Sequence, residues 1–149
     1  MDSRPLLEMV RQRLGDNMDE YFIPPPVFEA MEGEFLAFDK DSGTLTTRFP
    51  VLDKHLNPYG TMQGGMVAAA VDNTLGPLSM LIARPNVTRR LHMKYNRPVT
   101  PDLEQIVVLG RLTARKGRRL FFSAEVRDQN GLLLARARAD HWILDDSSA

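Results

Sequence analysis

One segment of the chain constrains the fold more than any other: QGGMVAAAVDNTLGPLSMLIA, residues 63–83. It is too long and too rich in alanine for a strand, so the sequence predicts a helix. Asp72 is the only charged residue within it. Because a helix that is apolar on nearly every side is stable only when it is enclosed, the rest of the chain must wrap around this segment.

The segments on either side of this helix have the pattern of strands. EFLAFD at 34–39 and TLTTRFPV at 44–51 are joined by the turn KDSG. Further strands are predicted near 87–96, 104–115, 118–128 and 132–143, with turns at RKGR and QNG. Short turns make neighbouring strands antiparallel. We therefore expect an α+β fold, in which an antiparallel sheet of five to six strands wraps around a long central helix. The helix residues that would let the sheet approach closely are Ala68, Ala69, Ala70 and Gly76.

The N-terminal residues differ from the rest of the chain. Ser3 can cap a helix with apolar residues at helical spacing; these are Leu6, Leu7, Val10 and Leu14. Three prolines at 24–26 resist both a helix and a central strand, and a short helix is expected at 27–31. We divide the chain into an N-terminal helical extension, residues 1–32, and one main domain, residues 33–144.

Composition excludes several classes of function. The 149 residues suit one domain, and 19 basic residues balance 19 acidic ones, which gives no support to a nucleic-acid or membrane-surface role. The absence of cysteine rules out disulfides, thiolate chemistry and zinc sites built on sulfur. The N-terminus shows no secretory signal, and no segment approaches the roughly 20 apolar residues that span a bilayer. We expect a cytoplasmic protein that binds neither membrane nor nucleic acid.

The three histidines, His55, His92 and His141, show neither the i, i+4 spacing nor the clustering of a metal site. We interpret all three as structural or surface residues and predict no metal.

Two glycines stand where the long helix begins. The first N–H groups of a helix lack partners within the helix and carry partial positive charge. At Gly64 and Gly65 no side chain obstructs them, so a carbonyl oxygen that gains negative charge can rest there, as in an oxyanion hole. The alternative is tight packing of the helix end against a strand.

Asp72 is harder to explain by packing, because aspartate is a poor interior helix former and is rarely buried alone. It can act as a general base or a nucleophile; alternatively, it marks the one solvated edge of the helix, beside Asn73. At 1.5 Å per residue, Asp72 lies roughly 12 Å beyond Gly64. One helix cannot bring both to the same small group, so a catalytic role predicts an isologous dimer with the site at its interface.

The stretch NPYGTMQGGMVAAAVDNTLG, residues 57–76, resembles the signature of hotdog-fold acyl-CoA thioesterases of the phenylacetic-acid-degradation type. That signature has an Asn, a Gly three residues later, His-Gly-Gly at the helix start, and an Asp or Glu seven residues after the second Gly. The matching residues are Asn57, Gly60, Gly64, Gly65 and Asp72. TRRLHMKYNRPVTP, residues 88–101, is similar to the following strand of that family, and the element order implies a hotdog domain over residues 33–144.

The resemblance implies a role for each matching residue. The N–H of Gly64 or Gly65 would polarise a thioester carbonyl, and Asp72 of the partner chain would act as base or nucleophile. Thr88 of that same partner would orient the water, and Asn57 would help shape the oxyanion side. The products would be a free acid and coenzyme A, with no cofactor, since coenzyme A belongs to the substrate. The expected assembly is a homodimer, with a dimer of dimers as the alternative.

Gln63 departs from the signature, which has histidine at this position. Glutamine can donate a hydrogen bond to a carbonyl but cannot titrate near neutral pH. Gln63 therefore either replaces the histidine as a polarising group or indicates a second function, an acyl-CoA binding protein with little or no catalysis. Hydration of an enoyl-CoA is disfavoured, because hydratases of this fold typically use a close Asp and His pair and none is apparent.

Basic residues are the remaining candidates. Arg115, Lys116, Arg118 and Arg119 surround one hairpin turn, and Arg89 and Arg90 follow Thr88. They are either a solvated surface or a clamp for the phosphates of coenzyme A, for which the planar fork of arginine is suited. The sequence identifies neither the acyl group nor its pocket.

Overall fold

The computed structural model describes residues 4–15 and 20–145. Ser3, the predicted helix cap, lies outside them. The helices are α1 (Arg4–Leu14), α2 (Pro26–Ala30) and α3 (Gly64–Ile82), with two single-turn 3₁₀ helices, η2 (Asp53–His55) and η3 (Pro101–Leu103). The strands are β1 (Glu34–Asp39), β2 (Thr44–Pro50), β3 (Asn86–Tyr95), β4 (Gln105–Lys116), β5 (Arg119–Arg127) and β6 (Leu133–Ile143).

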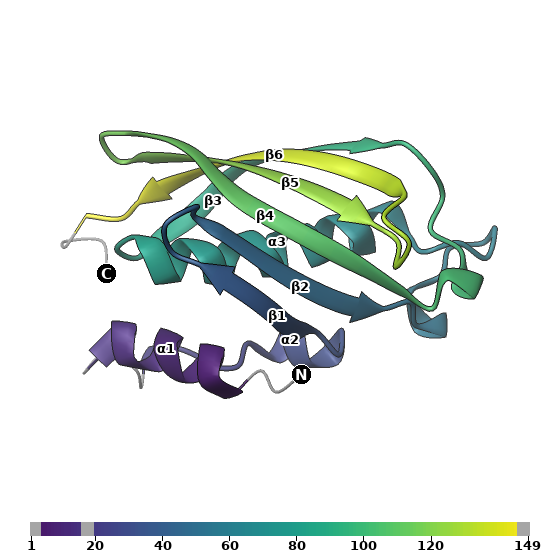
Figure 1. The fold of residues 1–149 in the computed structure, drawn as a ribbon, viewed down its shortest axis with the longest axis horizontal. Helices are drawn as coiled ribbons and strands as arrows, with labels where there is room; N and C mark the ends of the chain where they lie inside the picture. Colours follow the sequence, from purple (N-terminus) through teal and green to yellow (C-terminus); the bar gives the residue numbers. More distant parts are fainter. Residues whose placement is uncertain (1–3, 16–19, 146–149) are drawn as a thin grey trace.

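All six strands form one antiparallel sheet in the order β1-β2-β4-β5-β6-β3. The sheet curves over α3, which runs along its concave face (Figure 1). The predicted α+β architecture, with an antiparallel sheet wrapped around a long central helix, is confirmed. The strand β3 follows α3 in the chain but pairs with the last strand, β6, so β3 forms one edge of the sheet and β1 forms the other.

One face of α3 packs against the sheet, and Ala70, Val71, Leu75 and Leu78 on it have no exposed surface. The closest approach is made possible by Gly110 of β4, because a Cβ added there would lie 2.7 Å from Leu75 Cδ2. The prediction that Gly76 permits this approach is wrong. Nothing lies within 4 Å of a Cβ added at Gly76, since that residue is on the side of the helix turned away from the sheet.

The expectation that no segment is long and apolar enough to cross a bilayer is also wrong when only length and composition are considered. The 19 residues of α3 pass that test, with a mean hydropathy of 1.3. The position of this helix against the sheet identifies it as the buried core helix of the fold. Its apolar composition is therefore explained by packing within the chain.

The N-terminal helices lie against the same core. Leu6, Leu7 and Val10 of α1 pack against it, and α1 contacts α3. Phe28 of α2 stacks on Phe35 of β1, with ring centroids 4.5 Å apart, and meets Phe49 edge-on at 5.8 Å. These aromatic contacts pack α2 against the sheet.

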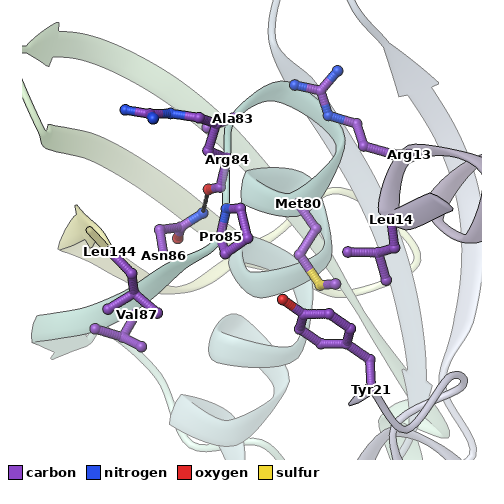
Figure 2. A pocket seen from close by; sticks show the side chains of 10 residues that line it. All are labelled: Arg13, Leu14, Tyr21, Met80, Ala83, Arg84, Pro85, Asn86, Val87 and Leu144. Atoms are coloured by element: carbon purple, nitrogen blue, oxygen red, sulfur yellow. Dashed lines mark hydrogen bonds between the residues drawn. The ribbon is translucent and has the colours of Figure 1, made fainter. Parts of the chain in front are cut away.

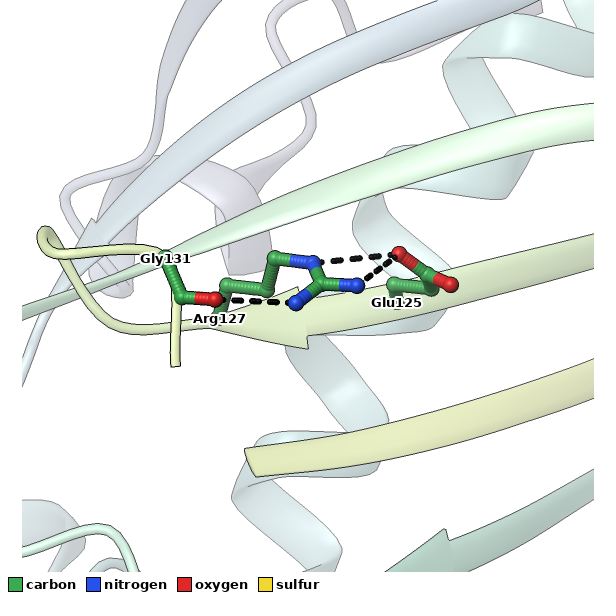
Figure 3. Close-up of polar contacts among 3 residues, drawn as sticks. All are labelled: Glu125, Arg127 and Gly131. Atoms are coloured by element: carbon green, nitrogen blue, oxygen red, sulfur yellow. Dashed lines mark hydrogen bonds and ion pairs between the residues drawn. The ribbon is translucent and has the colours of Figure 1, made fainter. Parts of the chain in front are cut away.

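The β5–β6 hairpin is held by side chains as well as by its turn. Asp128 Oδ1 accepts hydrogen bonds from the N–H groups of Asn130 and Leu132, and Gly131 adopts a φ of +88° that favours glycine. Arg127 donates two hydrogen bonds to Glu125 and one to the Gly131 carbonyl (Figure 3). These contacts fix the register in which β6 returns to β5 and then meets β3.

The outer face of the sheet carries three exposed cations on β3 and β6. Lys94 lies opposite Arg136, and Arg138 lies opposite the exposed His92. Like charges directly opposite each other disfavour strand pairing. The fold thus tolerates a concentration of positive charge on this face in a chain whose formal net charge is zero.

Candidate active site

The start of α3 leaves two backbone donors free. The Gln63 carbonyl accepts hydrogen bonds from the N–H groups of Met66 (2.8 Å) and Val67 (3.1 Å). Among the residues that the structure describes, no acceptor bonds the N–H of Gly64 or Gly65. Gly65 is exposed, and nothing lies within 4 Å of a Cβ added there, so no side chain of this residue or contact with its neighbours obstructs the approach of a ligand. This geometry is what an oxyanion hole requires.

Tyr95 of β3 holds the first peptide unit of the helix. Its hydroxyl donates a hydrogen bond of 2.5 Å to the Gly64 carbonyl, and its ring would lie 3.2 Å from a Cβ added at Gly64. Because the Gly64 carbonyl and the Gly65 N–H belong to one peptide plane, Tyr95 also fixes the direction of that donor. A cavity of about 280 Å³ opens here, lined by Gly64, Tyr95 and the exposed Arg97.

Asn57 organises the loop that leads to the helix. Its Oδ1 accepts from the N–H groups of Tyr59 (3.0 Å) and Thr61 (3.1 Å), and its Nδ2 donates to Thr61 Oγ1 at 2.9 Å. Gln63 is the N-cap residue, but its exposed side chain makes no capping hydrogen bond within the described chain. The Asn57 side chain is thus committed to the loop, whereas that of Gln63 is available to a ligand.

The second centre lies two turns along the same helix. Thr88 of β3 donates a hydrogen bond of 3.0 Å from its hydroxyl to Asp72 Oδ1, so the structure joins the two predicted residues. In a single protomer Asp72 is exposed, on the solvated edge of α3. The β3–β6 register shifts between Thr88 and Arg90, which inserts Arg89 as an extra residue. Such bulges commonly re-aim side chains beside active sites.

Two further residues, absent from the sequence prediction of the site, extend this centre into the core. His141 of β6, only 1% exposed, places Nε2 3.3 Å from Thr88 Oγ1. Its Nδ1 lies 2.8 Å from Oδ1 of Asn86, which precedes Thr88 by two residues on β3. Burial lowers the pKa of His141, against the opposing effect of the Asp72 and Asp140 charges.

The expectation that no aspartate and histidine come together is therefore wrong, since both Asp72 and His141 contact Thr88. His141 is buried, however, and its ring packs against Phe122 with centroids 4.8 Å apart. A histidine enclosed in this way cannot reach a substrate directly, so the contact does not restore the hydratase alternative.

The two centres stay apart within one chain. Gly65 and Asp72 are seven residues apart, which places them on the same side of α3 but separates them by about 10 Å along the helix axis. Both are exposed, and they are the exposed residues of α3. Neither is covered by the sheet, so both face whatever occupies the open side of the helix.

The predicted basic residues fall into two groups. Arg118 donates two hydrogen bonds to the Ile143 carbonyl and pairs with Asp145, and Arg119 pairs with Asp140. Arg89 lies over the Trp142 ring, 4.9 Å from its centroid. By contrast, Arg90, Arg115 and Lys116 are exposed and have no ion-pair partner within the described residues. The charges of Arg90, Arg115 and Lys116 are therefore available to a ligand.

A larger cavity of about 470 Å³ lies where the C-terminal end of α3 meets α1 and the start of β3. Figure 2 shows Met80, Tyr21 and Leu14 on one side of it and Val87 and Leu144 on the other. Asn86 belongs to its wall and donates from Nδ2 to the Arg84 carbonyl at 3.0 Å. Asn86 thus links the wall of this cavity to His141.

The comparisons with known proteins decide the family. A sequence profile described as Thioesterase superfamily matches residues 59–135, more than half of the chain, and this match includes the two glycines, Asp72 and Thr88. The chain belongs to the Thioesterase superfamily. No curated protein matches this thioesterase-superfamily chain by sequence.

Solved structures share the hotdog fold of this chain. The phenylacetic acid degradation-related protein of Ralstonia eutropha JMP134 has 26% identity and a TM-score of 0.77, covering 91% of this chain and 98% of its own. The Escherichia coli PaaI protein of the phenylacetic acid degradation operon has 14% identity, a TM-score of 0.76 and coverages of 94% and 96%. A Streptococcus mutans protein bound to acetyl CoA has 21% identity, a TM-score of 0.70 and coverages of 75% and 88%.

Proposed function

We propose that the protein hydrolyses an acyl-CoA thioester to the free acid and coenzyme A, at a site formed by two copies of the chain. The observation that carries the proposal is the open face of α3, which presents two unbonded glycine N–H groups at one end and the Asp72–Thr88 pair two turns later. The acetyl CoA bound to the Streptococcus mutans relative supports a coenzyme A ester as the substrate class.

A second copy supplies what one chain lacks. Antiparallel α3 helices related by a two-fold axis would bring Gly65 of one protomer to Asp72 of the other. Two features support this assembly. The strand β3 is an edge strand with largely exposed residues, which leaves backbone groups available for pairing. The side of α3 that carries Gly65, Asp72 and Gly76 is not covered by the sheet, and its small residues permit close approach.

Each group then has one chemical task. The Gly64 and Gly65 N–H groups stabilise the negative charge that develops on the thioester carbonyl oxygen. Asp72 accepts a proton from the attacking water, while Thr88 holds the carboxylate in place. The carbon–oxygen bond forms, and the carbon–sulfur bond then breaks to release coenzyme A. The exposed amide of Gln63, beside the glycines, donates to the same carbonyl without titrating.

The primary experiment measures thiol release from a panel of acyl-CoA esters of different length and aromatic character. Gly65→Pro is the sharpest variant, because proline removes one N–H but is tolerated in the first turn of a helix. We expect kcat to fall about 100-fold with the helical content unchanged. Gly60→Ala, which alters a glycine of the preceding loop, controls for general disturbance of the region, although its φ of +79° will cost some stability.

Complementation tests the shared site directly. A Gly65→Pro chain retains Asp72, and an Asp72→Asn chain retains the glycine donors. When the two are unfolded and refolded together, half of the dimers mix and each mixed dimer has one intact site, so about a quarter of wild-type activity should return. No recovery in mixtures that form dimers would contradict a site built from two chains.

Arg90, Arg115 and Lys116 are the candidates for binding the phosphates of coenzyme A, since their charges have no partner in the described chain. Reversal of Arg115 and Lys116 to glutamate should raise KM for acyl-CoA at least severalfold. A short thioester without the nucleotide should be unaffected. The same reversal at Arg118 and Arg119 should instead reduce stability, because it breaks contacts with Ile143, Asp145 and Asp140. If the reversal of Arg115 and Lys116 raises KM equally for acyl-CoA and for the short thioester, these residues do not bind the phosphates of coenzyme A.

Gln63 favours the second candidate function, acyl-CoA binding with little catalysis. Saturable binding of acyl-CoA without thiol release across the panel would select this alternative. Gln63→His then provides a direct comparison, because it introduces a group that titrates near neutral pH. A large gain in kcat in this variant would show that the wild-type residue limits the chemistry.

A further inference from the structure

Four side chains from three elements form one line of contacts that runs from the open face of α3 into the core. Asp72 Oδ1 accepts from the Thr88 hydroxyl at 3.0 Å, Thr88 Oγ1 lies 3.3 Å from His141 Nε2, and His141 Nδ1 lies 2.8 Å from Asn86 Oδ1. The line passes from an exposed carboxylate to a side chain that is 1% exposed. The two inner residues, His141 and Asn86, have no direct contact with the groups that we place at the reaction.

Asn86 determines which nitrogen of His141 carries a proton. Its Nδ2 donates to the Arg84 carbonyl at 3.0 Å, which can only accept, so Oδ1 of the amide must face His141. An amide oxygen also only accepts, and Nδ1 must therefore be the protonated nitrogen. In the neutral ring, Nε2 is then an acceptor that faces the Thr88 hydroxyl.

The Thr88 hydroxyl has one proton and two acceptors that compete for it. While Asp72 is ionised, the charge-assisted bond to the carboxylate is the stronger one, and the buried Nε2 of neutral His141 receives no proton from Thr88. When Asp72 takes up a proton, its carboxyl becomes a weaker acceptor. The Thr88 proton can then turn to Nε2, and the unsatisfied acceptor gains its hydrogen bond.

We propose that His141 is a positioning residue whose Nε2 remains an unsatisfied acceptor until Asp72 takes up a proton. Its hydrogen bond to Thr88 then forms, which favours proton uptake by Asp72 when water attacks the thioester. The proposal rests on the proposed function, with Asp72 acting as the base. A buried acceptor that is satisfied only after proton transfer stabilises the product side of that step more than its ground state. Thr88 thereby couples the two residues without losing its own proton.

Each proton that moves during the reaction has a donor and an acceptor. Water loses a proton to Asp72 as its oxygen bonds the carbonyl carbon, and the Thr88 hydroxyl turns from Asp72 to His141. When the carbon–sulfur bond breaks, the coenzyme A thiolate takes the proton from Asp72. The Thr88 hydroxyl then returns to the carboxylate, and His141 remains neutral throughout.

Protonation of His141 should abolish this arrangement, because Nε2 then donates to Thr88 and fixes the Thr88 proton on Asp72. The charged groups around the ring are Asp72 from α3 and Asp140 beside it on β6, which is paired with Arg119 of β5. On β3, Arg89 lies over Trp142, whose position on β6 points it to the opposite face of the sheet. Burial lowers the pKa of His141, so activity should fall on acidification with a midpoint below the usual histidine range.

Nitrogen NMR of the histidine rings tests the arrangement without relying on activity. At a pH where His141 is neutral, we expect its Nδ1 to be protonated and its Nε2 to be unprotonated. A neutral ring with the proton on Nε2 would overturn the proposal. If no acyl-CoA ester is hydrolysed, the proposed function fails while the NMR result still decides the hydrogen-bond arrangement, so the two failures are distinguishable.

His141→Gln and His92→Gln form a matched pair for kinetics, because His92 is exposed on β3. We expect His141→Gln to lower kcat about 10- to 100-fold, as the loss of one hydrogen bond in a charged network does, with KM changed less than about twofold. The part of the acid limb that comes from His141 should be lost, so that only the limb from the base Asp72 remains in the pH–rate profile. His92→Gln should match wild type. An unchanged kcat and acid limb in a folded His141→Gln protein would overturn the proposal.

Asn86→Asp tests the same link without removing the buried histidine, because it shifts the acid limb of kcat and does not abolish the group. A carboxylate beside Nδ1–H favours the charged ring, so the acid limb of kcat should move to higher pH by about one unit or more. A purely structural role of His141 predicts no such movement. An acid limb at the wild-type position, in a variant whose His141 titration has moved by NMR, would overturn the link between His141 and catalysis.

Discussion

On the side of α3 that meets the sheet, Leu75 and Leu78 have no exposed surface, and a Cβ at Gly110 of β4 would clash at 2.7 Å. On the other side, Asp72 is exposed and a Cβ at Gly65 would meet nothing within 4 Å. The residues of the packed side are explained by the fold of one chain. Those of the open side are not required for packing of one chain, which is why we propose that they serve a ligand and a second copy.

The largest expected effect is on the open side. Asp72→Asn keeps an acceptor for the Thr88 hydroxyl but cannot take up a proton, so kcat should fall by about 10²- to 10⁴-fold. Because the side chain is exposed, the thermal midpoint should stay near that of wild type. Asp102→Asn, at an exposed position in η3, is the matched control for loss of a carboxylate. Unchanged thiol release by Asp72→Asn would remove this residue from the mechanism.

The packed side should respond in the opposite way. Gly110→Ala places a Cβ against Leu75 and within 3.3 Å of Thr74, both fully buried. Overpacking of this kind costs about 1–3 kcal/mol, to be measured by urea unfolding, while kcat of the folded protein should stay close to wild type. A variant that keeps its stability but loses kcat would contradict the separation of the two sides.

Acidification should weaken the fold through two histidines, the buried His141 and the partly buried His55. Burial lowers the pKa of both His141 and His55 in the folded protein, so below the ordinary histidine pKa of about 6.5 the unfolded chain binds more protons than the folded one. The free energy of unfolding should fall as pH drops from 7, and the part of this fall that comes from the histidines should end below their folded pKa values. Each unit of lowering is worth about 1.4 kcal/mol. Urea unfolding at a series of pH values should show a shallower slope for His141→Gln.

The smallest effect is expected at Gly76. Alanine there meets no atom of its own chain and improves helix propensity by roughly 0.5–1 kcal/mol, but the Cβ before Pro77 partly offsets this gain. The stability of the dissociated chain, followed by urea unfolding at low protein concentration, should change by less than about 0.5 kcal/mol. A cost as large as that of Gly110→Ala would show that Gly76 is packed after all.

The fold could be predicted from the sequence because its strongest signals are local. The apolar segment 63–83 requires enclosure, and the turns at Gly43, Gly117 and Gly131 separate strands of alternating pattern. What the sequence does not reveal is non-local pairing. Which glycine allows the helix to approach the sheet depends on the register of β4 over α3, and for this reason the sequence pattern points to Gly76 instead of Gly110.

The same limit applies to the candidate site. Gly64, Gly65 and Asp72 lie on one helix with a recognisable spacing, and Thr88 follows it closely. His141 and Asn86 are 55 residues apart, and they meet only because the chain's third and last strands pair with a bulge at Thr88. A buried histidine with no neighbouring motif gives no signal in the sequence, so its contact with Thr88 required the structure.

The cations on the outer face of the sheet restrict how copies of this protein can associate. Two molecules stacked back to back through this surface would bring Lys94, Arg136 and Arg138 of each against the same groups of the other, and like charges at such short range repel. These charges therefore disfavour back-to-back stacking of two molecules. The convex surface is left to water, counter-ions or an anionic neighbour, and occupancy by such a neighbour should weaken as salt concentration rises.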